Sequence, residues 1–212
     1  GFRVSLLVAA AVTALSLLVG VMLGMIGGYL GGSTDRVVRS STDFIWGFPL
    51  ILVAVLLVGG LGEGLFPVIL AVGIVNVAAI TRVVRGEVVG LKEKEFVEAA
   101  RAAGVSSYRI MWRHLLPNVL APALIMASYL IAVAIIAEAA LSFIGLGAQP
   151  PLPSLGKMIA DGRGFLRINH WEATIPGIGI VVLVLAVSMI GDGLRDHFDP
   201  RLRHERGSKK NR

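Results

Sequence analysis

Five long stretches of the chain carry no Asp, Glu, Lys, Arg or His, and this pattern constrains the fold more than any motif. The stretches cover residues 4–34, 44–62, 64–81, 115–137 and 173–191. A helix that crosses a bilayer needs about 20 mostly apolar residues, with a range of roughly 17–25. A transmembrane β-barrel would instead alternate apolar and polar residues in segments of about ten. The sequence therefore predicts an all-α membrane protein, a polytopic bundle of about five transmembrane helices.

The composition excludes other classes of protein. Hydrophobic residues make up 55% of the chain and charged residues 16%, against roughly 25% charged in an average soluble protein. Such a chain is too apolar to be disordered. It has no cysteine, which excludes disulfides, thiolate metal sites and cysteine nucleophiles. The net charge of +6 is confined to the segments between the apolar stretches, so we interpret it as a topology signal and predict no nucleic-acid partner.

The distribution of Lys and Arg predicts the orientation in the membrane. Sixteen of these residues lie in one set of connecting segments, a loop at 31–43, the segment 82–113 and the chain from 195 onward. Four lie in the other set, at Arg3 and in residues 147–172. Positive residues favour the cytoplasmic side, so we expect the C-terminus inside and Gly1 outside. Because the first span begins at once and Gly1 is not a methionine, we expect at least one helix to precede it.

Three glycines recur at four-residue spacing in the first stretch, Gly20, Gly24 and Gly28. Small residues at this spacing let two helix backbones approach closely in lipid. Two interpretations follow: a contact with a helix of another subunit, or packing within this chain.

The segment between the third and fourth stretches predicts two helices joined by a turn. Residues 93–103 are rich in Glu, Lys and Ala, which favour helix. Gly104 stands where a helix C-cap takes a left-handed residue, and Ser106 and Ser107 can cap a second short helix. A compact surface of this kind suits docking into a groove on a partner protein; a solvated connector is the alternative.

This segment also resembles a known family. Glu98-Ala99-Ala100, Gly104 and Leu116-Pro117 resemble the EAA loop of permeases in binding-protein-dependent ABC importers. His114 stands where the general pattern has an aliphatic residue, but residues 113–118 resemble the dipeptide, oligopeptide and nickel branch of that family. Further stretches resemble the same branch in the same order: residues 3–8, 138–147 with 149–151, and 191–196 with 199–203. The resemblance places a permease domain over residues 1–203 and leaves a basic cytoplasmic tail at 204–212.

The resemblance implies a function and a set of partners. It implies a multi-pass subunit of the cytoplasmic (inner) membrane of a bacterium or archaeon, forming half of a path for dipeptides or oligopeptides by alternating access. The implied partners are a second homologous permease subunit, two ATP-binding subunits and an extracytoplasmic substrate-binding protein. The implied ATPase-coupling residues are Glu98, Ala99, Ala100, Gly104, Arg109, His114, Leu116 and Pro117.

The chain lacks a G-x-x-x-x-G-K-[ST] motif for binding nucleotide phosphates. We therefore expect a subunit that is not an enzyme and binds no cofactor, with ATP and Mg held by partner subunits.

Two polar residues within the apolar stretches are candidates for the translocation path. Glu138 is the one carboxylate that interrupts a long apolar run, and ionisable residues inside a membrane often mark functional sites. Glu138 either lines the path or ties its helix to a neighbour. Asn76 is the second candidate, and we expect it to form an interhelical hydrogen bond.

The segment 147–172 is long for a turn between helices, with helical spacing over 155–166. The resemblance implies that it docks the substrate-binding protein, and the docking candidates are Pro150, Pro151, Lys157 and Arg163. The alternative is an amphipathic segment that faces lipid.

Other functions stay open at this point. A permease of the same branch for nickel or another small solute would share these motifs. An ion-coupled secondary transporter using Glu138 would require paired intramembrane charges and broken helices in matching halves. An intramembrane enzyme would require a catalytic constellation that the sequence does not contain. The four histidines have no metal-ligand spacing, so we predict no metal site.

Overall fold

The structure is a computed structural model that describes residues 1–198, and every regular element in this range is helical. The α-helices are α1 (Phe2–Leu30), α2 (Gly32–Trp46), α3 (Leu50–Leu61), α4 (Leu65–Leu91), α5 (Glu95–Ala102), α6 (Ser107–Ile110), α7 (Leu116–Phe143), α8 (Leu155–Gly162) and α9 (Trp171–Phe198). A π-helical turn, Met111–Leu115, joins α6 to α7, and a 3-10 turn, Arg163–Phe165, follows α8. The all-α prediction is confirmed, and the segments 199–203 and 204–212 lie outside the described residues.

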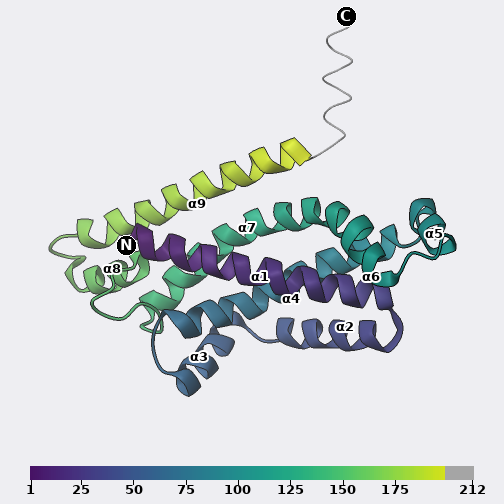
Figure 1. The fold of residues 1–212 in the computed structure, drawn as a ribbon. Helices are drawn as coiled ribbons and strands as arrows, with labels where there is room; N and C mark the ends of the chain where they lie inside the picture. Colours follow the sequence, from purple (N-terminus) through teal and green to yellow (C-terminus); the bar gives the residue numbers. More distant parts are fainter. Residues whose placement is uncertain (199–212) are drawn as a thin grey trace, which may run out of the picture.

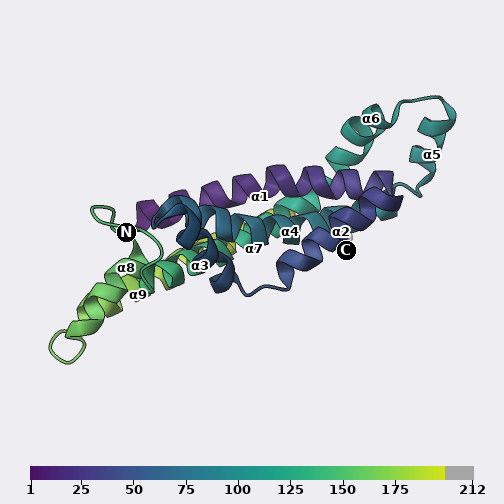
Figure 2. The ribbon, with the colours of Figure 1, turned by 90° about the horizontal axis from the view of Figure 1, so that it is seen from below.

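The long helices α1, α4 and α7 lie side by side at the centre of an elongated bundle (Figure 1). Helices α5 and α6 project from one end, which we call the hairpin end, and α3 and α8 lie at the other, the loop end (Figures 1 and 2). Helix α9 packs along α7 and α8. Four helical segments are long and apolar enough to cross a membrane, namely those beginning at Phe2, Leu65, Ser107 and Trp171.

The stretch 44–62 does not form one straight helix, and residues 31–43 are not a loop. Helix α2 covers most of the expected loop, and it meets α3 at 92° across a short break. Pro49 stands at this break, where it lacks an N–H and disfavours helix at the preceding residue. The 12 residues of α3 rise only about 18 Å, short of the ~30 Å hydrocarbon layer. The predicted count of about five spans therefore includes α2 and α3 as one bent span.

Helices α1 and α4 approach closely through the three spaced glycines of α1. Each glycine meets one β-branched residue of α4: Gly20 meets Ile80, Gly24 meets Val84, and Gly28 meets Val88. A Cβ added to Gly24 would lie 2.7 Å from the Cβ of Val84 and 2.9 Å from the carbonyl oxygen of Thr81. A ridge of branched side chains thus fills a groove of glycines. The structure therefore supports the second interpretation, in which the three glycines pack against another helix of the same chain.

Two apolar clusters fill the bundle. At the hairpin end, Met25 and Ile80 pack in one buried cluster with Val97 of α5 and Ile110 of α6. At the loop end, a second cluster joins α1, α4 and α7 through Val8, Val72 and Ile135. The short helices of the hairpin are therefore anchored in the core of the bundle.

We expect Gly24→Leu to destabilise the protein, because its side chain would meet Val84 and force α1 away from α4. Overpacking of this kind typically costs about 1–3 kcal/mol. The matched control is Gly86→Leu, since a Cβ at Gly86 meets no atom within 4 Å. The midpoint of thermal aggregation in detergent, followed by size-exclusion chromatography, should fall by several degrees for Gly24→Leu only. Equal midpoints for the two variants would contradict this packing.

Candidate functional site

The turn after α5 is built on one left-handed residue. Gly104 has a φ of 74°, a conformation that glycine adopts without steric cost. Its N–H donates to the carbonyl of Arg101 at 3.0 Å, and the N–H of Val105 donates to the carbonyl of Ala100 at 3.0 Å. The predicted left-handed glycine at the end of this helix is confirmed, and the C-cap residue itself is Ala103. A Cβ at Gly104 would meet nothing within 4 Å, so the requirement for glycine lies in the backbone.

Helix α6 leads directly into the membrane-spanning part of the chain. Ser106 occupies the predicted N-cap position in extended conformation, but its side chain forms no capping hydrogen bond. The sequence thus located this helix start correctly and its capping interaction wrongly. The π-helical turn then carries the chain into α7 without a loop. The hairpin formed by α5 and α6 is therefore mechanically continuous with α7.

One side of the hairpin is anchored and the other is exposed. Val97 and Ile110 are fully buried. Three aromatic side chains of the hairpin and the following turn are exposed instead, Phe96, Tyr108 and Trp112, at 43%, 73% and 41%. The rings of Tyr108 and Trp112 lie 6.0 Å apart, and we call the three residues the aromatic surface of the hairpin. Exposed aromatic clusters are typical of protein interfaces. This surface was not predicted from the sequence, although Tyr108 and Trp112 stand four residues apart.

The predicted coupling residues all lie on the hairpin or at the start of α7. Most are exposed: Glu98, Ala99, Gly104, Arg109 and Pro117. The others, Ala100, His114 and Leu116, are partly buried. Glu98 lies in the first turn of α5, where a negative charge interacts favourably with the helix dipole. The structure therefore gathers this predicted set at one end of the bundle.

Two ion pairs hold α2 against α4, and sequence analysis did not predict them. Arg85 binds both carboxylate oxygens of Asp35, with its Nη2 2.6 Å from Oδ2. Arg82 Nη2 lies 2.9 Å from Asp43 Oδ1. The sequence did contain a pattern that favours a helix here, because Asp35, Arg39 and Asp43 are spaced by four residues and residues at this spacing share one face of a helix.

Glu138 is fully buried and sits in a hydrogen-bonded network near the loop end. The hydroxyl of Ser5 on α1 donates to its Oε2 at 2.7 Å, and the hydroxyl of Ser142 donates to its Oε1 at 2.7 Å. The N–H of Ala148 donates in turn to Ser142 Oγ at 3.2 Å. The network ties α1, α7 and the turn after α7 together. This geometry supplies the tie between helices that the sequence analysis considered, while a place of Glu138 on the path stays a prediction.

Asn76 on α4 does not form the expected interhelical hydrogen bond through its amide nitrogen. The residue is 3% exposed, and its Nδ2 has no hydrogen-bond partner among the described residues. That part of the prediction was wrong. The geometry does not join Asn76 to the Glu138 network, so the two path candidates remain separate.

The segment after α7 folds back onto the loop end of the bundle. Helix α8 is shorter than the predicted helix over 155–166, because it ends at Gly162 and continues as a 3-10 turn. A Cβ at Gly156 would lie 2.0 Å from the carbonyl oxygen of Ala139, so α8 is pressed against α7. The docking candidates lie around this helix, and Pro150 and Pro151 are exposed. Lys157 Nζ lies 3.1 Å from Asp161 Oδ1. The Cζ of Arg163 lies 5.9 Å from the centre of the Phe143 ring.

We expect Glu138→Ala to destabilise the bundle, because it removes both acceptors of two buried hydroxyls. Leaving buried polar groups unpaired costs about 1–3 kcal/mol each. Glu63→Ala is the matched control, since Glu63 is exposed in the turn before α4. The readout is the midpoint of thermal aggregation in detergent. A midpoint that falls no further for Glu138→Ala than for Glu63→Ala would contradict a stabilising network.

Comparison with known sequences places this arrangement in a family. Residues 20–204 match the family described as binding-protein-dependent transport system inner membrane component. The chain is 42% identical to the dipeptide transport system permease protein DppC of Alkalihalophilus pseudofirmus, over 96% of this chain and 67% of that protein. It is 37% identical, with the same coverage, to the oligopeptide transport system permease protein OppC of Bacillus subtilis and to the glutathione transport system permease protein GsiD of Pectobacterium atrosepticum.

Solved structures support the fold. A chain of the inward-facing MetNI methionine ABC transporter superimposes with a TM-score of 0.74 at 20% identity, covering 93% of this chain and 94% of that chain. A chain of an amino acid ABC transporter crystallised with histidines gives 0.69 at 17% identity, covering 92% and 90%. Together with the family match over residues 20–204, these findings confirm the resemblance seen in the motifs: the chain belongs to the inner membrane components of binding-protein-dependent transport systems and is a permease of an ABC importer.

Proposed function

We propose that this chain is the permease subunit of an importer for short peptides. The observation that carries the proposal is the substrate class in the names of its relatives, which are permeases for dipeptides, oligopeptides and glutathione. All three are peptides, and the similarity extends over nearly the whole chain. In this proposal a second homologous permease subunit forms the other half of the path. Asn76 and Glu138 are the polar residues of this chain that we propose as candidates for lining the path.

The proposed coupling element is the hairpin of α5 and α6. Its aromatic surface is exposed, while Val97 and Ile110 fix the hairpin to the buried cluster shared by α1, α4 and α7. An ATP-binding subunit that holds this surface would therefore move the ends of α4 and α7 together. A partner shifts a conformational equilibrium only through contacts that differ between the two states. ATP and Mg would be bound and consumed on two such subunits.

The proposed orientation puts the hairpin end in the cytoplasm. The hairpin end carries Arg101, Arg109 and Arg113, and positively charged segments favour that side. The C-terminus then also lies inside, and α8 lies outside. We propose that the surface around α8, with Pro150, Pro151, Lys157 and Arg163, receives an extracytoplasmic substrate-binding protein.

The substrate class is tested by uptake into proteoliposomes that contain the complete importer. We expect ATP-dependent uptake of labelled di- and tripeptides, with competition by unlabelled peptides. Uptake of labelled nickel, with no uptake of peptides, would refute the peptide proposal and favour the other members of this branch. Uptake by this chain without ATP-binding subunits would refute the importer mechanism itself.

We expect Gly104→Val to uncouple ATP hydrolysis from uptake, because a β-branched residue strongly disfavours positive φ and the hairpin angle would change. Peptide uptake per ATP hydrolysed should fall at least severalfold. Gly104→Asn should retain most coupling, since Asn tolerates the left-handed region.

The matched control is Gly90→Val, since Gly90 is exposed near the end of α4 and a Cβ there meets nothing within 4 Å. Coupling should be unchanged in this variant. An unaltered ratio of uptake to hydrolysis in Gly104→Val would refute the role of the hairpin angle.

A further inference from the structure

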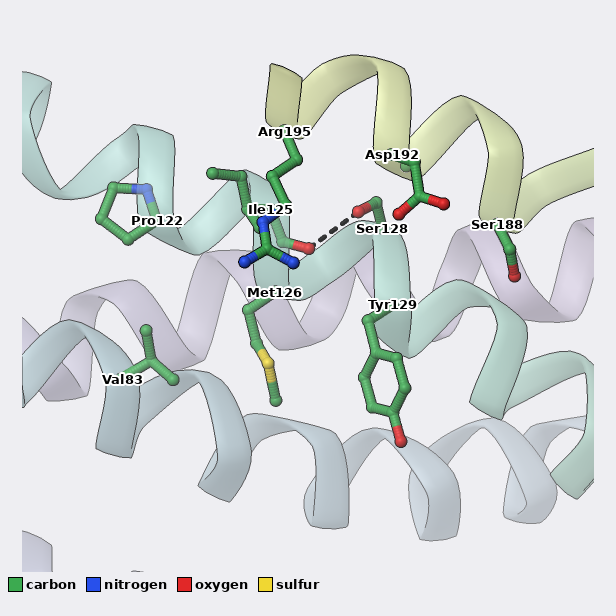
Figure 3. A pocket seen from close by; sticks show the side chains of 10 residues that line it. Val83, Pro122, Ile125, Met126, Ser128, Tyr129, Ser188, Asp192 and Arg195 are labelled. Atoms are coloured by element: carbon green, nitrogen blue, oxygen red, sulfur yellow. Dashed lines mark hydrogen bonds between the residues drawn. The ribbon is translucent and has the colours of Figure 1, made fainter. Parts of the chain in front are cut away.

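A pocket of about 510 Å³ lies between α4, α7 and α9, away from the hairpin and from the Glu138 network (Figure 3). Its volume is within the range of roughly 300–1,000 Å³ that is typical of small-molecule sites. Most of its wall is apolar, formed by Val83, Ile125 and Met126. Asp192 and Arg195 of α9 provide the charged part of the lining.

The pocket lies at the depth where charged residues begin. Val83 stands between Arg82 and Arg85 on α4, and Asp192 is the first charged residue after the apolar stretch 173–191. On both helices this marks the boundary between the hydrocarbon layer and the headgroup region. Along its apolar part α9 has large exposed side chains, among them Val181, Leu185 and Met189, so the pocket lies beside a surface that lipid can reach.

The charged groups of the pocket form a pair of opposite sign. Asp192 and Arg195 lie one helical turn apart on α9, and the ion pairs among the described residues include none between them. Figure 3 shows the guanidinium of Arg195 directed into the space beside Ile125 and Met126. The hydroxyl of Ser128 is already used, because it donates to the carbonyl of Ile125 at 2.7 Å. The charged groups available to a ligand are therefore the guanidinium of Arg195 and the carboxylate of Asp192, next to an apolar wall.

We infer that this pocket binds a phospholipid whose headgroup carries both a phosphate and a primary ammonium, the ethanolamine class. Arg195 binds the phosphate through charge-assisted hydrogen bonds, Asp192 binds the ammonium, and an acyl chain lies against Val83, Ile125 and Met126. Pockets with basic residues between membrane helices are known to recognise headgroups. A purely anionic headgroup offers no cation to the carboxylate of Asp192, and a choline headgroup has no N–H to donate to it.

The bound lipid lies next to a direct contact between α9 and α7 and adds a link to α4. Gly191 packs against Ser128, and a Cβ at Gly191 would lie 2.8 Å from Ser128 Oγ. Both residues line the pocket, so the pocket begins at this contact. The inference does not depend on which solute is transported.

The experiment uses the complete importer in nanodiscs with a photoreactive phosphatidylethanolamine that carries a diazirine on one acyl chain. We expect label on residues 122–129 of α7, and competition by unlabelled phosphatidylethanolamine that exceeds competition by phosphatidylglycerol or phosphatidylcholine. Val83→Phe fills the pocket and should reduce labelling severalfold. Arg195→Gln should weaken the competition by roughly tenfold, as expected for loss of a charge-assisted hydrogen bond.

Two exposed residues of α2 provide matched controls, because Val37→Phe and Arg36→Gln make the same changes away from the pocket. Labelling should be unchanged in both. Equal labelling of Val83→Phe and Val37→Phe would overturn the inference, and so would equal competition by all three lipids. Protection of the pocket by substrate peptide, or cross-links from a probe at Met126 to another protein chain, would assign the pocket to a different occupant and would also overturn it.

Discussion

The close approach of α1 and α4 is the contact on which the rest of this bundle depends. In lipid, helices gain little from hiding apolar side chains from water, so association relies on close packing and on hydrogen bonds between helices. Gly20, Gly24 and Gly28 provide that closeness, and the branched side chains of α4 fill the groove they form. The α4 residues of this contact, Ile80, Val84 and Val88, also belong to the buried cluster that holds α5 and α6. A weaker contact between α1 and α4 would therefore also weaken the packing of the hairpin.

The two ends of the molecule are connected by helices that have no loop between them. From Ser107 the chain runs through α6, the π-helical turn and α7 to Phe143, and one turn before that end Glu138 binds Ser5 and Ser142. A displacement of the hairpin would therefore reach α7 directly, at the end that lies before Pro122, where the helix lacks one backbone hydrogen bond. The turn that holds Ala148 and the helix α8 would then receive it. This continuity relates the surface proposed for an ATP-binding subunit to the surface proposed for a binding protein.

The sequence predicted those parts of the structure that depend on local pattern. Uncharged stretches located the four long spans, and Gly104 located a turn, because a positive φ is a local backbone requirement. The helix over residues 32–46 was missed because its charges suggested a loop, whereas in the structure those charges pair with Arg82 and Arg85 of α4. No local signal predicts the bond from Ser5 to Glu138, whose partners are 133 residues apart. Pairings of this kind depend on tertiary packing, which leaves no local pattern in a single sequence.

Glu138 and Asn76 show why polarity within an apolar stretch does not by itself assign a role. Both residues are buried in helices, and both interrupt an apolar run. Glu138 has each carboxylate oxygen bound by a hydroxyl, so its burial is compensated and it holds two helices together. The Nδ2 of Asn76 has no acceptor among the described residues, and an unpaired buried amide lowers stability rather than raising it. The difference lies in the neighbours that α1 brings to α7 but not to Asn76, and therefore in how the helices pack.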